Sequence, residues 1–71
     1  MKANKFVVAG LTDAAMIPDI KQSIKNHDGI NAVRVDMQEG TVTVDYDEGR
    51  YKESDIKRFV SETGLDVREI K

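Results

Sequence analysis

The hydrophobic pattern of this chain changes its period from one short segment to the next, and the order of these segments is what most limits the possible folds. Lys5 to Ala9 has a strand pattern, with Phe6 and Val8 on one face. The next apolar residues recur at spacings of three and four, which is typical of one stripe on a helix; they are Ile17, Ile20 and Ile24. The chain therefore begins with a strand followed by a helix.

Residues 30–37 and 41–46 have the next strand patterns. In the second of them Val42, Val44 and Tyr46 alternate with polar residues, as expected for a strand with one buried face. Gly40 lies between the two segments and permits a tight turn. We therefore predict a β-hairpin here.

A second helix is predicted to begin near Lys52 to Ser54. Tyr51 and Ile56 are spaced like a hydrophobic staple around this start, and Gly64 supplies the stop. The apolar residues of the helix are Ile56, Phe59 and Val60, and those of a last strand are Leu65, Val67 and Ile70.

The predicted order is therefore βαββαβ, an α+β fold of the ferredoxin-like sandwich type. Right-handed crossovers place both helices on one face of a four-stranded antiparallel sheet, for which we expect the strand order 4-1-3-2. A chain of 71 residues supports a single small core, so residues 1–71 are expected to form one domain.

The two faces of the sheet are predicted to differ. Between the sheet and the helices we expect a core of Phe6, Val8, Ile20, Ile24, Ile30, Val33, Val35, Val42, Val44, Ile56, Val60 and Leu65. On the other face we expect solvent around Val7, Arg34, Asp36, Thr41, Thr43, Asp45, Asp66 and Arg68.

Composition excludes several classes of function. The net charge of −2 and a pI near 5.3 argue against nucleic-acid binding, which requires a basic patch. Apolar runs are too short for a membrane span and the first residues do not resemble a signal peptide, so we expect a cytoplasmic protein with no membrane partner. The chain has no cysteine and one histidine, which excludes disulfides, thiolate nucleophiles and multi-histidine metal sites.

From about Phe6 to Val67 the chain resembles the heavy-metal-associated domain family, which includes copper chaperones and N-terminal modules of metal-transporting ATPases. Residues 10–16 stand in the frame of the family motif Gly-Met-Thr-Cys-x-x-Cys, and Gly64 and Leu65 fall where the family usually has Gly-Tyr. Further matches are Ile20 and Ile24 in the first helix, Asp28 to Ile30 at its exit, and Val42, Val44, Tyr46 and Asp47 in the third strand. The resemblance implies the same fold.

The chain departs from this family at the metal site itself. Asp13 and Met16 stand where the two cysteines of the motif would be. Two soft thiolates suit linear Cu(I), whereas one hard carboxylate and one neutral thioether do not reproduce that site. Asp13 and Met16 are therefore the candidate residues of a degenerate metal site, and the alternatives are a backbone cap for Asp13 and space-filling for Met16.

Other candidate residues have simpler interpretations. Pro18 is tolerated only in a first helical turn, so the helix is expected to begin near Met16 or Ile17. His27 would lie roughly 16 Å from Met16 along a helix, and we interpret it as a surface residue near the helix end. The acidic run at Asp45 does not fit a calcium loop, because Ile56 occupies the twelfth position.

Three classes of function remain. We expect a non-catalytic protein-interaction or regulatory module that has lost metal binding, has no cofactor, is a monomer, and binds a protein partner through the Leu11 to Ile17 loop. The alternative is a weak or partner-assisted carrier of Cu(I) or another soft metal through Met16 and Asp13. A small-molecule binder or enzyme would require a pocket with convergent polar groups, for which the sequence contains no signal.

Overall fold

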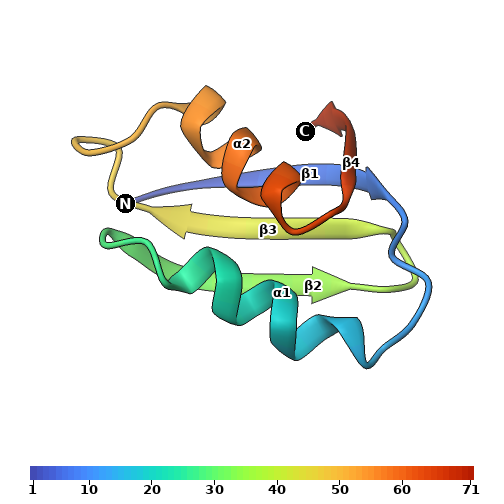
Figure 1. Ribbon diagram of the computed structural model, residues 1–71. Coiled ribbons are helices and arrows are strands. Elements are labelled where there is room, and N and C mark those ends of the chain that lie inside the picture. Colours follow the sequence, from blue (N-terminus) through green and yellow to red (C-terminus); the bar gives the residue numbers. More distant parts are fainter.

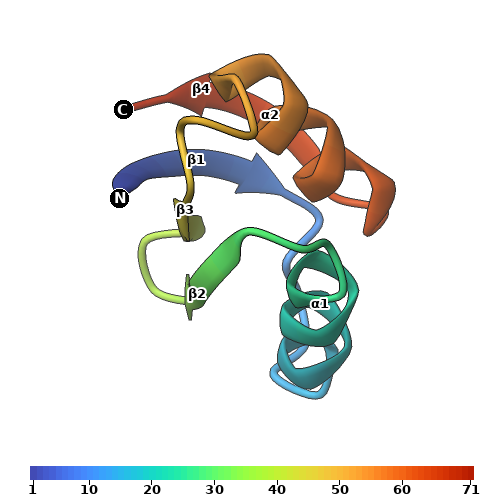
Figure 2. The same ribbon diagram turned by 90° about the vertical axis from the view of Figure 1, so that its left-hand side faces the viewer.

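Four strands of the computed structural model, which describes residues 1–71, form one antiparallel sheet in the order β2-β3-β1-β4 (Figure 1). The elements are β1 (Lys2–Ala9), α1 (Met16–Lys25), β2 (Ile30–Asp36), β3 (Thr41–Tyr46), α2 (Glu53–Glu62) and β4 (Asp66–Ile70). The predicted βαββαβ order and the predicted strand order are both confirmed. Both helices lie on the same side of the sheet, α1 beside β2 and α2 beside β1 and β4 (Figure 2).

The helix starts follow from local chemistry. Pro18 is the third residue of α1 and therefore lies in the first turn, where its missing N–H costs no helical hydrogen bond. At the start of α2, the Asp55 carboxylate accepts a hydrogen bond from the backbone N–H of Lys52 at 2.9 Å. This contact satisfies one of the donors that a helix N-terminus leaves unpaired.

The core lies between the sheet and the two helices. It consists of Phe6, Val8, Ile20, Ile24, Val33, Val42, Val44, Tyr46, Ile56, Phe59, Val60 and Leu65. Ile30 and Val35, which were predicted in the core, are only partly buried and pack against it. Both belong to β2, which has a neighbouring strand on one side only.

Two polar residues, Asn4 and Thr41, are buried, and the sequence analysis placed neither of them in the interior. β1 begins at Lys2, three residues before the predicted start, because it pairs with β3 up to Tyr46. Asn4 therefore lies on the core face of β1 and is 6% exposed. Thr41, which was expected in solvent, is 3% exposed and donates a hydrogen bond to Glu39 at 3.3 Å.

Two successive hydrogen bonds make the burial of Asn4 possible. The Tyr46 hydroxyl donates to Asn4 Oδ1, and Asn4 Nδ2 donates to Glu53 Oε2 at 2.8 Å. Burial, and then the charges of Glu53 and Glu48, raise the pKa of Tyr46 above its ordinary value of 10.0. The chain of contacts joins β3, β1 and the start of α2 at one end of the core.

Candidate functional site

The segment that joins β1 to α1 carries the candidate site. It begins at Gly10, whose φ of +99° lies in the left-handed region that favours glycine. A Cβ at this position would lie 3.8 Å from a methyl group of Leu65. The segment therefore starts beside Leu65, which precedes β4, so two residues that are distant in the sequence meet at this end of the fold.

Asp13 caps the turn that leads into α1. Its Oδ1 atom accepts a hydrogen bond from the backbone N–H of Ala15 at 2.9 Å, and its carbonyl oxygen accepts one from Met16 at 2.9 Å. The side chain is exposed. The capping interaction predicted for Asp13 is thus present, and one of its two carboxylate oxygens is engaged by the backbone.

Met16 has a different environment. It is half-buried and packs against the core. It also lines a hollow of about 330 Å³ between the two helices, together with Asp19, Ile20, Ser23, Glu62 and Thr63. Asp13 does not line this hollow, so the structure places the two candidate residues on one turn but gives them separate contacts.

Residues 5–66 match the family model described as heavy-metal-associated domain. The chain belongs to this family. A comparison with curated protein sequences gives no match.

Solved structures similar to this heavy-metal-associated domain agree with its fold. A copper-binding domain of a P-type ATPase is 27% identical with a TM-score of 0.89, and the match covers 100% of this chain and 95% of that one. The CopZ metallochaperone is 24% identical with a TM-score of 0.85, covering 94% and 100%. Oxidized MerP from Ralstonia metallidurans is 18% identical with a TM-score of 0.84, covering 99% and 96%; these last two matches support the fold alone.

This heavy-metal-associated domain cannot provide the two thiolate ligands of the family motif. It contains no cysteine, and no three side chains of His, Cys, Asp or Glu lie together in an arrangement suited to a metal ion. At the motif positions, the chemistry on offer is one capping carboxylate and one thioether packed against the core. Neither supplies the anionic sulfur that a soft ion prefers.

The sequence analysis placed Ile17 in a helical stripe and at the end of the partner-binding loop, but it did not predict how far the core covers this side chain. It is half-buried, yet it is absent from the partly buried side chains that pack against the core. The first turn of α1 therefore presents an aliphatic side chain at the surface next to the loop. Only the packing of Met16 and Ile20 reveals this, because all three residues satisfy the same helical spacing.

His27 is placed differently from the prediction. Instead of lying free on the surface, it is half-buried and stacks on Phe59 of α2, with ring centroids 3.7 Å apart and an angle of 8° between the planes. The two residues are far apart in the sequence, so helical spacing gave no signal for this contact.

No helix of the domain is both long enough and apolar enough to cross a bilayer.

Proposed function

We propose that this heavy-metal-associated domain is a non-catalytic protein-interaction or regulatory module, which binds its partner through the Leu11 to Ile17 loop and does not carry a metal ion by itself. One observation carries the proposal: the two positions that hold cysteines in the family motif are given to turn capping and core packing. Asp13 bonds the backbone N–H of Ala15, and Met16 packs against the core.

The loop also has properties that suit a partner interface. Thr12, Asp13, Ala14 and Ala15 are exposed, and Ile17 adds an aliphatic side chain that the core does not cover. An apolar side chain surrounded by exposed polar ones matches the apolar centre and polar rim of a protein–protein contact. A similar solved structure is a copper-binding domain of a P-type ATPase, so the class of partner that we propose is a protein of metal transport.

A second candidate is a partner-assisted carrier of a soft metal. Met16 supports it, because its thioether lines a hollow at the end of the domain that bears the loop. One thioether gives Cu(I) an incomplete set of ligands. In this scheme the partner must supply the thiolates, and the domain alone binds the ion weakly.

Cu(I) competition against a chromogenic chelator separates the two candidates. Carefully demetallated wild-type protein should leave Cu(I) with the chelator, because the domain offers no thiolate pair. Met16→Leu removes the thioether and keeps an apolar side chain of similar volume. If the wild type binds Cu(I) tightly and Met16→Leu abolishes this binding, the result would favour the metal carrier over the interaction module.

Photo-crosslinking tests the interface directly. A crosslinking amino acid at Thr12 lies on the exposed loop, and one at Lys57 lies on the exposed face of α2 and serves as the matched control. A partner that is captured from Thr12 and not from Lys57, and that is lost with Ile17→Ser, is the expected result. Equal capture from both positions would contradict the assignment of the loop.

A further inference from the structure

The outer edge of β2 is free to pair with another chain. β2 is the first strand in the order β2-β3-β1-β4, so β3 occupies only one of its sides. None of the backbone hydrogen bonds formed outside the helices and the sheet involves residues 31–36. The N–H and C=O groups that point away from β3 therefore have no partner within the domain.

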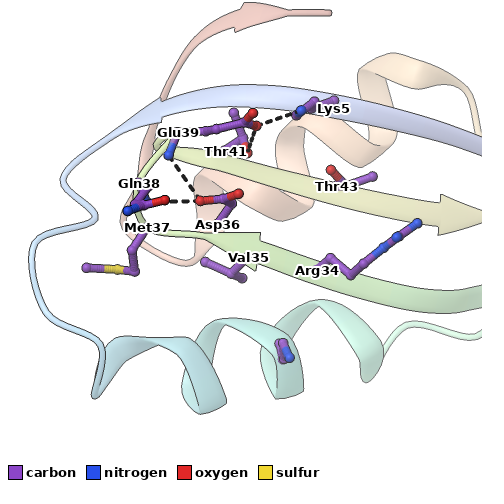
Figure 3. A pocket seen from close by; sticks show the side chains of 10 residues that line it. Lys5, Arg34, Val35, Asp36, Met37, Gln38, Glu39, Thr41 and Thr43 are labelled. Atoms are coloured by element: carbon purple, nitrogen blue, oxygen red, sulfur yellow. Dashed lines mark hydrogen bonds and ion pairs between the residues drawn. The ribbon is translucent and has the colours of Figure 1, made fainter.

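A hollow of about 680 Å³ adjoins this edge. Its walls include Arg34 and Val35 of β2, Thr43 of β3 and Lys21 of α1. Figure 3 shows these strand residues from the helix-free side of the sheet, with α1 running along the outer side of β2. The hollow thus reaches from the open face of the sheet to α1, past the free edge of β2.

The charges beside this edge are unbalanced. Lys5 is neutralised by Glu39, with 2.6 Å between Nζ and Oε1, and this contact lowers the pKa of Glu39. Lys21 and Arg34 form no ion pair, and Lys25 follows Lys21 by one helical turn on the same side of α1. The carboxylates near this edge are Asp36, whose Oδ1 accepts hydrogen bonds from the N–H groups of Gln38 and Glu39, and Asp45, which lies opposite Ala32 on β3, so three unpaired cations stand against two carboxylates.

We propose that the β2 edge binds an extended acidic segment of a partner protein by strand addition. The backbone of the segment would pair with the outward groups of residues 32–36, which follow the register shift between Ile30 and Ala32, and its side chains would alternate between the two faces of the enlarged sheet. Carboxylates on the open face meet Arg34. Residues on the opposite face meet Val35, and carboxylates there reach Lys21.

The unpaired cations decide in favour of an acidic occupant. The domain as a whole carries a net charge of −2, so its general field repels an acidic chain and only a local excess of positive charge attracts one. A second copy of the domain fits less well. Antiparallel pairing of two β2 edges would bring together two α1 helices and their unpaired lysines, since α1 runs along this side of the strand (Figures 2 and 3).

The test uses a synthetic peptide of alternating glutamate and valine, as long as β2, with a lysine–valine peptide as the charge control. The glutamate–valine peptide should bind, and it should slow the hydrogen exchange of β2 amides measured by NMR. Two methylated peptides are compared, one with methyl groups on the odd-numbered backbone nitrogens and one with methyl groups on the even-numbered ones. Only one of them should lose binding, because only one of these sets of N–H groups faces β2. Binding without protection of β2, or equal binding of the lysine–valine peptide, would overturn the proposal.

Charge reversal on the protein supplies the matched comparison. Arg34→Glu should lower the affinity for the glutamate–valine peptide by roughly tenfold. Lys57→Glu, a similar charge reversal on an exposed part of α2, should leave this affinity unaltered. Equal effects of both variants would overturn the proposal. It would also be overturned if the wild type sediments as a dimer and its β2 amides are already protected from hydrogen exchange without the peptide. Ile17→Ser should not affect this peptide, so failure at the β2 edge and failure of the Leu11 to Ile17 loop are distinguishable.

Discussion

His27 and Phe59 stack face to face, with ring centroids 3.7 Å apart and an 8° angle between their planes. Tyr51 meets the same Phe59 ring edge-on at 5.1 Å, and its hydroxyl donates a hydrogen bond to the carbonyl oxygen of Asp28. The end of α1, the residues that follow it and α2 are therefore joined by one aromatic cluster of His27, Tyr51 and Phe59. This cluster lies at the end of α1 opposite to Met16.

A double-mutant cycle on the stack should reveal coupling between the two helices. Phe59→Ala removes a core side chain and should lower the free energy of unfolding by about 3 to 5 kcal/mol. His27→Ala should cost less, and the interaction between the two changes should be about 0.5 to 1.5 kcal/mol, because the second change no longer loses the stack. Urea unfolding of the four proteins measures this value, and strict additivity would show that the stack contributes nothing.

Tyr46 should make the domain less stable at alkaline pH. Its folded-state pKa is raised above the ordinary 10.0 by burial, Glu53 and Glu48. The unfolded chain therefore releases the phenolic proton first, so the stabilisation is fully present below pH 10 and is lost as the pH rises through the folded-state pKa. Urea unfolding at a series of pH values from neutral to alkaline checks this.

Tyr46→Phe is the matched variant. At neutral pH it should cost about 1 to 3 kcal/mol, because Asn4 Oδ1 loses its donor in a buried site. Above pH 10 the difference between Tyr46→Phe and the wild type should shrink. A constant difference across the whole series would mean that Tyr46 titrates with the same pKa in both states.

Restoring the two motif cysteines should restore soft-metal binding. Asp13→Cys combined with Met16→Cys places two thiolates on a loop that still begins at Gly10 and leads into α1 at residue 16, whereas either single change leaves Cu(I) with an incomplete set of ligands. Chelator competition for the wild type, both single variants and the double variant tests this. A folded double variant that binds no tighter than the wild type would show that the loop itself has diverged.

The two faces of the sheet should respond differently to truncation. Ile24→Ala and Val44→Ala remove fully buried side chains and should cost roughly 2 to 4 kcal/mol each. Thr43→Ala and Arg34→Ala, on the open face, should change the free energy of unfolding by about 0.5 kcal/mol or less. Thermal and urea unfolding measure all four, and similar losses in both pairs would mean that the strand faces are assigned wrongly.

Local pattern was a good guide to the elements of this fold. The stripe of Ile20 and Ile24 and the alternation of Val42 and Val44 each report a single helix or strand, and Pro18 marks the first turn of α1 through its own geometry. These signals lie within a few residues of one another, so propensity and periodicity determine them. The start of β1 escaped this reasoning, because the pairing of Lys2 with Tyr46 of β3 determines it.

At the candidate site, the sequence alone determined which chemistry is missing: without cysteine, no fold can present two thiolates to a metal ion. Tertiary structure decided how the remaining residues are used. Met16 and Ile17 satisfy the same helical pattern and are both half-buried, but only Met16 packs against the core. His27 meets Phe59, and Asn4 meets Tyr46, only because the sheet and the helices bring distant segments together. Such contacts depend on the shape of the whole core, which the spacing of nearby residues does not encode.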